Sequence, residues 1–208
     1  MSAPSGALVG IVDDDPSVRK GLARLVKGAG YRVEAFASAR EFLARPEQED
    51  PCCLLLDVRM PGLTGLELQE ALATAGRRMS IVFVSGHGDV VGSVKAMKGG
   101  AIDFLTKPVD ARELLGVIER AVAKALTAQR EQAGATDVQG RLKTLTAREA
   151  QVFALVVTGM LNKQIAADLG IVEKTVKVHR ARVMEKMRAG SLAELVRLAD
   201  RAGIIAKP

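Results

Sequence analysis

The first 125 residues alternate short apolar runs with segments of helical periodicity, and this alternation restricts the fold more than any other feature of the chain. We expect strands close to Leu8 to Val12, Arg32 to Ala35, Cys53 to Leu56, Ile81 to Val84 and Ile102 to Leu105. Continuous apolar strands separated by helices are typical of a parallel sheet covered on both faces. The sequence therefore predicts a doubly wound, five-stranded α/β domain.

Polar side chains that could bind a ligand or take part in a reaction follow the ends of these apolar runs. Five of them are Asp13, Asp14, Asp57, Ser85 and Lys107. Since the carboxyl ends of parallel strands lie along one edge of a sheet, we expect these side chains to converge on one crevice. Three carboxylates suit a hard cation such as Mg²⁺ or Mn²⁺, and a carboxylate can attack a phosphoryl group. Taken alone, the acidic run would equally serve to cap a helix beginning near Pro16.

Charge is divided unevenly along the chain. From Arg141 onward there are 13 Lys and Arg against six Asp and Glu, a balance of +7, whereas the earlier residues carry 17 against 18, a balance of −1. A basic part joined to a neutral part is typical of a nucleic-acid-binding module attached to another domain. Between them, residues 126–141 are small and polar, and we expect a linker. Its start favours helix, and Gly134 and Gly140 favour flexibility.

Residues 142–208 have helical periodicity throughout. Thr146 and Glu149 form a capping box ahead of the first apolar face, and Gly170 marks a tight turn between the second and third helices. We expect four helices, and the third, from about Glu173 to Met187, is rich in Lys and Arg. Two helices joined by a short turn, with a basic second member, favour a helix-turn-helix that enters the major groove of DNA.

Composition excludes two other classes of protein. No run of about 18 uncharged apolar residues is present, so no membrane segment is expected. Residues 1–6 lack the basic and apolar regions of a secretion signal, which favours the cytoplasm. The adjacent Cys52 and Cys53 are expected to be buried hydrophobic side chains without metal or redox function.

Four motifs in the first half resemble the receiver domain of two-component response regulators. They are VDDD at 12–15, LLLDVRMPGLTG at 54–65, VFVSGHGD at 82–89 and AIDFLTKP at 101–108, and the resemblance covers nearly all of residues 7–125. It implies that Asp57 accepts a phosphoryl group from a histidine kinase. It also implies a Mg²⁺ site made by Asp13, Asp14, Asp57 and the backbone carbonyl of Arg59.

The same resemblance implies roles for the residues around the phosphoryl group. Ser85 and Lys107 would contact the phosphate, the bond between Lys107 and Pro108 would be cis, and Phe104 would be the aromatic switch residue. Arg59 and His87 stand at positions that tune the lifetime of the phosphoryl group, and we expect them to influence autodephosphorylation.

The second half resembles the DNA-binding domain of LuxR-type regulators, over about residues 142–203. LTARE at 145–149 and LNKQIAADLGIVEKTVKVHRARVMEKM at 161–187 carry the resemblance, and SLAELVRLA at 191–199 is similar to the FixJ and styrene-catabolism branch. It implies approach to bases or flanking phosphates by Lys177, Val178, Arg180 and Arg182. It implies phosphate contacts by Asn162, Lys163, Thr175 and His179. Leu161 and Val172 depart from the usual polar capping residues.

Together the two resemblances imply a response regulator of the FixJ/NarL class. Phosphorylation of Asp57 would promote formation of a homodimer that binds promoter DNA and acts through RNA polymerase. Two alternatives remain. One is a phosphatase or kinase-like enzyme with Asp57 as nucleophile, although the basic half then has no role. The other is a DNA-binding regulator whose receiver is a dimerisation scaffold that needs no phosphorylation.

Overall fold

The computed structural model describes residues 6–46, 50–77, 79–86 and 90–204. The chain divides into two compact units, Met1–Ala128 and Gln129–Pro208. Among the described helices, none is both long enough and apolar enough to cross a membrane.

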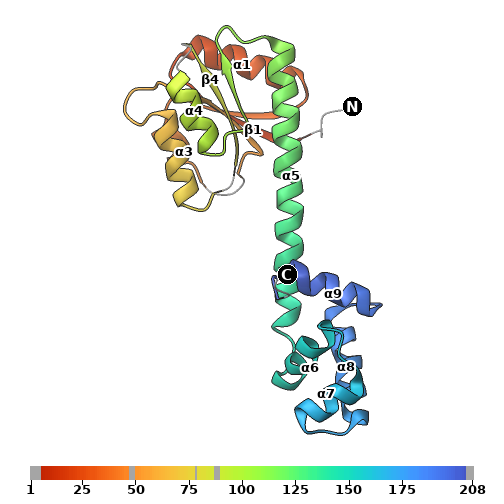
Figure 1. Cartoon of the computed structure of the whole chain (residues 1–208). Helices are drawn as coiled ribbons and strands as arrows, with labels where there is room; N and C mark the ends of the chain where they lie inside the picture. Colours follow the sequence, from red (N-terminus) through yellow and green to blue (C-terminus); the bar gives the residue numbers. More distant parts are fainter. Residues whose placement is uncertain (1–5, 47–49, 78, 87–89, 205–208) are drawn as a thin grey trace. The chain divides into compact units, whose positions relative to one another are not determined.

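The N-terminal unit is built on a five-stranded parallel sheet (Figure 1). Its strands are β1 (Leu8–Val12), β2 (Arg32–Phe36), β3 (Cys53–Asp57), β4 (Ser80–Ser85) and β5 (Asp103–Thr106). The spatial order is β2-β1-β3-β4-β5, so β1 has β2 on one side and β3 on the other. This reversal of strand order opens a crevice at the carboxyl ends of β1 and β3. The predicted doubly wound sheet is confirmed, and every strand end lies within one residue of its expected position.

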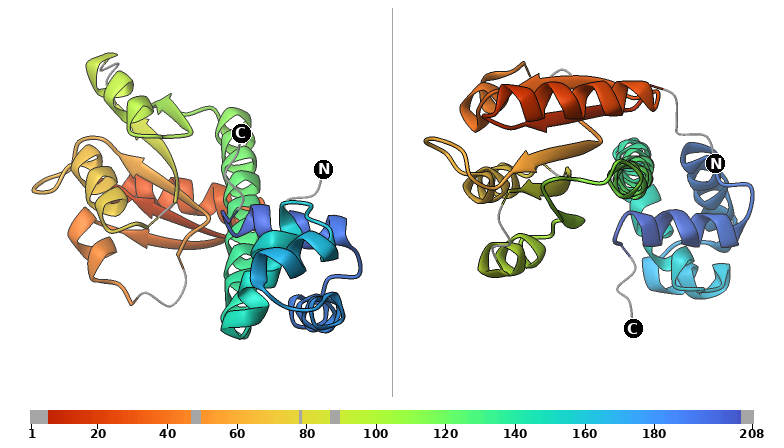
Figure 2. Two further views of the ribbon diagram at one scale, coloured as in Figure 1. Left: turned by 60° about the horizontal axis from the view of Figure 1, so that its bottom comes forward. Right: turned by 90° about the horizontal axis from the view of Figure 1, so that it is seen from above.

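Helices cover both faces of the sheet (Figure 2). One face packs against α1 (Pro16–Gly28) and the first part of α5 (Ala111–Leu142). The other packs against α2 (Ala39–Ala44), α3 (Gly65–Thr74) and α4 (Val90–Lys98). Side chains of a strand alternate between the faces: Cys53 and Leu55 enter the first core, whereas Leu54 and Leu56 enter the second. This burial on both faces explains why β1, β3 and β4 read as continuous apolar runs, whereas β2 and β5 at the edges of the sheet are partly exposed.

The C-terminal unit contains the four expected helices. They are α6 (Ala147–Val157), α7 (Asn162–Leu169), α8 (Glu173–Met187) and α9 (Leu192–Arg201). Thr146 and Glu149 form the predicted capping box of α6, and Gly170 ends α7 in a left-handed conformation with φ of 62°. Val152, Ile165 and Val183 are fully buried in its core.

Helix α5 includes all of the residues expected as a linker. Gly134 and Gly140, which favoured flexibility, both lie within the helix. Each glycine costs a helix about 1 kcal/mol relative to alanine. The Ala, Gln, Arg and Glu residues before them favour helix, and Val138 between them is buried in the C-terminal core, which offsets that cost.

Candidate functional site

Three carboxylates meet at the crevice between β1 and β3. Asp57 is the last residue of β3, Asp13 follows β1 directly, and the two strands pair in parallel with Val12 beside Leu56. Asp13, Asp14 and Asp57 can each place one carboxylate oxygen so that these atoms all lie within 4.8 Å of one another. Asp13 and Asp57 are buried, and Asp14 is exposed. This acidic cluster can bind a divalent metal ion, because hard cations prefer carboxylate oxygens.

The three consecutive aspartates have two roles: Asp13 and Asp14 belong to the acidic cluster, and Asp15 caps a helix. Asp15 is the N-cap of α1, and its side chain accepts hydrogen bonds from the main-chain N–H groups of Ser17 and Val18 at 2.7 and 3.2 Å. Asp13 and Asp14 are therefore not needed to start the helix. Arg19 Nη1 donates to the carbonyl oxygens of Asp13 and Asp14 at 2.6 and 3.2 Å, which holds the two residues at the end of the strand.

Lys107 joins two members of the acidic cluster. Its Nζ donates to Asp13 Oδ2 at 2.7 Å and lies 3.2 Å from Asp57 Oδ2. Asp13 is 94 positions away in the chain, so only the fold brings these groups together. Lys107 supplies a positive charge that would face any anionic group transferred to Asp57.

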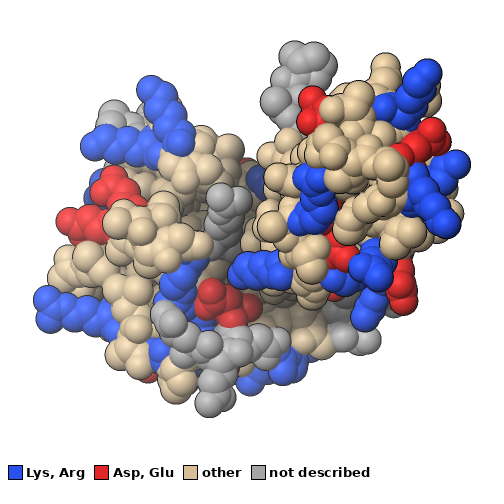
Figure 3. Space-filling model, turned by 90° about the horizontal axis from the view of Figure 1, so that it is seen from below, with Lys and Arg blue, Asp and Glu red and all other residues tan. Residues whose placement is uncertain are grey.

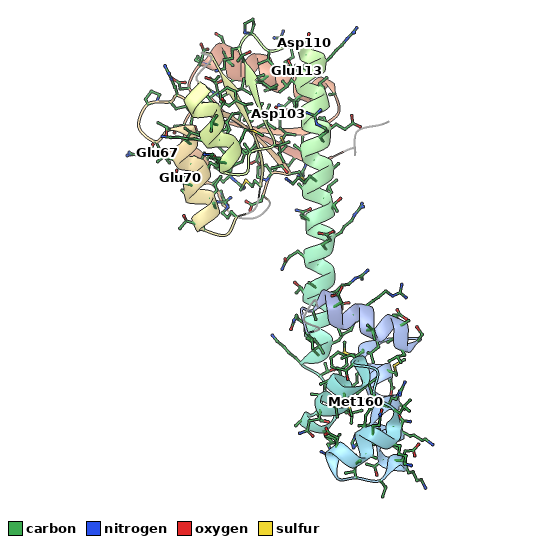
Figure 4. The ribbon with its side chains drawn as sticks, in the orientation of Figure 1. Glu67, Glu70, Asp103, Asp110, Glu113 and Met160 are labelled. Carbon is green, nitrogen blue, oxygen red and sulfur yellow. The ribbon has the colours of Figure 1, made fainter. Side chains whose placement is uncertain are left out.

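The loop that carries Lys107 is held at both ends. The main-chain N–H of Lys107 donates to the carbonyl of Ser85 at 2.7 Å, and the peptide bond between Lys107 and Pro108 is cis. Asp110, just before α5, caps the start of the helix. Its Oδ1 accepts hydrogen bonds from main-chain N–H groups of the first turn, including that of Glu113 at 3.0 Å. Figure 4 labels Asp110 and Glu113 at this end of the helix.

Burial and charge act in opposite directions on the groups of the crevice. Burial raises the pKa of Asp57 and the nearby Asp13 adds to the effect, although Lys107 and the main-chain N–H of Arg59 counteract them. Burial acts to lower the pKa of Lys107, but its hydrogen bond to Asp13 and the charge of Asp57 outweigh this, so its pKa is raised. Lys107 is therefore charged near neutral pH.

Of the other residues that the sequence predicted around the site, Ser85 and Arg59 lie near this edge of the sheet, and Phe104 lies within β5. Ser85 is the last residue of β4 and is 1% exposed. Arg59 has an exposed side chain, and its main-chain N–H bonds to Asp57. Phe104 is half-buried on β5 and stacks on Phe83 with a centroid distance of 6.3 Å. His87 lies outside the described residues.

Helix α8 presents a basic face. Lys177, Val178 and Arg182 are exposed, whereas Val176, Val183 and Met187 on the opposite side are buried. Lys177 Nζ lies 3.4 Å from Oε1 of Glu173, one turn earlier in the helix. Both side chains are largely exposed, and such surface ion pairs contribute little to stability. Figure 3 shows one face of the molecule, on which Lys and Arg side chains appear in blue with acidic side chains among them.

Most of the other residues predicted to contact DNA are half-buried in the structure. Arg180 is half-buried, and its Nη1 donates to Asn162 Oδ1 at 3.0 Å, which connects α8 to the start of α7. His179 is half-buried, and its Nδ1 is buried without a hydrogen-bond partner among the described residues. Thr175 is half-buried, whereas Lys163 is exposed.

Leu161 and Val172 occupy the N-cap positions of α7 and α8, and neither side chain forms a capping hydrogen bond. Both are among the most exposed large apolar residues, at 68% and 67%. Gln164 compensates in part at α7, because its Oε1 accepts from the main-chain N–H of Leu161 at 2.8 Å. A missing side-chain cap costs roughly 1 kcal/mol.

Sequence patterns did not reveal an ion pair between α6 and α8 in which the carboxylate is buried and the lysine is partly exposed. Lys186 Nζ donates to Glu149 Oε2 at 2.6 Å, and Glu149 is 2% exposed. From the sequence Lys186 is one more cation of a basic helix, and Glu149 is only the second member of a capping box. The hydrogen bond from Lys186, followed by that from the main-chain N–H of Thr146, lowers the pKa of Glu149 to about 2.

We expect a Glu149→Gln protein to be less stable at neutral pH and less sensitive to acid. Because the folded pKa is about 2 and the usual value 4.5, the carboxylate stabilises the fold fully above pH 4.5, and this contribution disappears as pH falls towards 2. Thermal unfolding between pH 2 and 7, followed by NMR methyl signals of Val152 and Val183, measures this. Glu185→Gln, an exposed position on α8, is the control. Parallel pH curves for wild type and Glu149→Gln would contradict the prediction.

Comparison with known families accounts for both halves of the chain. Residues 9–119 match the family described as response regulator receiver domain, and residues 143–199 match the bacterial regulatory proteins of the luxR family. The chain belongs to the two-component response regulators with a LuxR-type DNA-binding domain. These two domains imply a histidine kinase and promoter DNA as partners, and transcription regulation as the function.

Relatives cover almost the whole chain. It is 45% identical to nodulation protein W of Bradyrhizobium diazoefficiens, over 98% of this chain and 90% of that protein. It is 44% identical to the response regulator protein TmoT of Ectopseudomonas mendocina, over 94% and 89%. Among solved structures, the response regulator StyR has 43% identity and a TM-score of 0.84, over 95% of this chain and 99% of that one.

Proposed function

We propose that this response regulator accepts a phosphoryl group on Asp57 from a histidine kinase, and that the phosphorylated form dimerises and binds promoter DNA. The observation that carries the proposal is Lys107 Nζ, which lies within 3.2 Å of carboxylate oxygens of both Asp13 and Asp57. A carboxylate nucleophile, two neighbouring carboxylates and a cation are the groups that phosphoryl transfer requires.

The transfer itself is a substitution at phosphorus. An Asp57 carboxylate oxygen forms the new bond to phosphorus while the bond to the kinase's imidazole nitrogen breaks. Asp13, Asp14, Asp57 and the backbone carbonyl of Arg59 would hold Mg²⁺ or Mn²⁺, and the donor set fits, since it consists of hard oxygen ligands. When bound, the cation neutralises charge on the phosphoryl oxygens. In this proposal the protein is a phosphoryl acceptor that is able to autodephosphorylate, and not a conventional enzyme.

The response would pass from Ser85 and Phe104 to the DNA-binding domain. Ser85 donates a hydrogen bond to a phosphoryl oxygen, and Phe104, half-buried beside Phe83, turns inward. We place the receiver domain at residues 1–125, the linker at 126–141 and the DNA-binding domain at 142–208. The dimer binds DNA through Lys177, Val178, Arg180 and Arg182, with Asn162, Lys163, Thr175 and His179 at phosphates, and acts on RNA polymerase in the cytoplasm.

DNA-fragment selection with and without a phosphoryl donor tests the proposal. Purified protein is incubated with Mg²⁺ and acetyl phosphate, or with neither, and DNA binding and dimer mass are followed together. We expect the donor to tighten binding about tenfold, a usual allosteric coupling, and to increase the dimer fraction. Equal binding under both conditions would favour the alternative in which the receiver is only a dimerisation scaffold.

A further inference from the structure

The last turns of α5, from Asp137 to Leu142, pack within the C-terminal unit. Val138 is 2% exposed and belongs to the same apolar core as Val183 and Met187 of α8. Gln139 Nε2 donates to the carbonyl of Ala202, just after α9, at 3.1 Å. The match to the luxR family begins only at residue 143, so these contacts come from residues outside the matched domain.

Arg141 makes the contact that bears on DNA binding. Its Nη1 donates to the carbonyl oxygen of Met187, the last residue of α8, at 2.9 Å. Its Nη2 bonds to Asp137 Oδ2 at 2.5 Å, one turn earlier on α5, and its side chain is 22% exposed. Carbonyl groups in the last turn of a helix lack partners within the helix, and the helix dipole favours a cation there. Arg141 supplies both a donor and a positive charge.

The end of α8 has an unfavourable backbone conformation of its own. Arg188 ends the helix with φ of 52°, the only non-glycine residue in the described part of the chain with a positive φ. A side chain makes this conformation unfavourable. Lys186 contributes a second support, since its Nζ donates to the carbonyl of Thr144 at 3.0 Å as well as to Glu149. Residues on both sides of Leu142 therefore hold the same helix end.

We infer that Arg141 is a positioning residue for DNA binding. It holds the C-terminal end of α8, the second helix of the helix-turn-helix, which is proposed to contact the bases. The inference rests on the proposed function, and it moves the start of the DNA-binding domain from residue 142 to at least Asp137. Both guanidinium nitrogens that donate are engaged within the protein, so Arg141 acts through α8 and not through DNA phosphates. When the end of α8 is disordered in the free protein, the free energy needed to order it on DNA binding lowers the affinity for DNA.

Four full-length proteins test the inference: wild type, Arg141→Ala, Arg141→Lys and Arg130→Ala. Arg130 is exposed on the same helix, so its removal is a matched loss of charge. The affinity for a selected DNA fragment is measured at several salt concentrations, and hydrogen exchange is measured at the amides of Arg188 and Ala189 without DNA. Those amides bond to Glu185 and Met184 carbonyls at the end of α8.

We expect Arg141→Ala to weaken DNA binding about tenfold, to accelerate exchange at these two amides, and to leave the dependence of affinity on salt unchanged. Arg141→Lys keeps a charged donor and should recover most of the affinity, and Arg130→Ala should stay within about twofold of wild type. Unchanged exchange in Arg141→Ala, or a reduced salt dependence as for a phosphate contact, would overturn the inference. If the wild type itself binds no DNA, the proposed function fails, while the exchange measurement still decides whether Arg141 holds the helix end.

Discussion

An Asp57→Asn protein is expected to incorporate no measurable phosphoryl group from acetyl phosphate and Mg²⁺. Asparagine preserves the size of the side chain and its place at the end of β3, but an amide is not a nucleophile and carries no charge for the cation or for Lys107. We expect at least about a hundredfold loss of phosphorylated protein, since an amide cannot take the place of the attacking carboxylate. Intact-protein mass spectrometry at matched times measures the phosphorylated fraction.

The matched control is Asp168→Asn, which makes the same chemical change at an exposed position of α7. It should be phosphorylated like the wild type, and the donor should still tighten its binding to DNA. In Asp57→Asn the donor should change neither DNA binding nor dimer mass. A phosphoryl group found on Asp57→Asn, mapped by peptide mass to Asp13 or Asp14, would show that the acceptor has been assigned incorrectly.

A Gly65→Ala protein is expected to have a strongly destabilised N-terminal unit. A Cβ at this first residue of α3 would lie 2.1 Å from the carbonyl oxygen of Asp57, 3.0 Å from its carbonyl carbon and 3.1 Å from Leu56 Cγ. The carbonyl belongs to the last residue of β3, the proposed phosphoryl acceptor, so it cannot shift without moving the carboxylate cluster. Overpacking of this kind costs about 3 kcal/mol, and phosphorylation should slow as Asp57 is displaced.

Urea unfolding and the rate of phosphorylation measure the two effects separately. The control is Gly21→Ala in the middle of α1, where an added Cβ would meet nothing within 4 Å. There alanine should stabilise the unit by about 1 kcal/mol, because glycine is the weaker helix former. If Gly65→Ala unfolds at the same urea concentration as the wild type, the close approach of α3 to β3 does not matter for stability.

Local periodicity was enough to predict the strands, most of the helices and the edge on which the site lies, but not the length of α5. Apolar residues marked all five strands, and Leu54 and Leu55 show why the runs of the central strands are continuous: the sheet is covered on both faces. Capping residues are equally local, so Thr146 with Glu149 correctly predicted the start of α6. Because parallel strands share one carboxyl edge, the strand ends also predicted that Asp13, Asp57 and Lys107 converge.

What the sequence determined by itself is therefore the set of elements and the residues at their ends. Only the tertiary structure decided which aspartate caps α1, that Lys186 pairs with buried Glu149, that Arg141 reaches Met187, and that Gly65 lies against the Asp57 carbonyl. Apart from the local cap of α1, these contacts join residues of different elements, so no spacing along the chain signals them. Distances and burial decide between a solvated charge and a paired one, and both exist only in the packed fold.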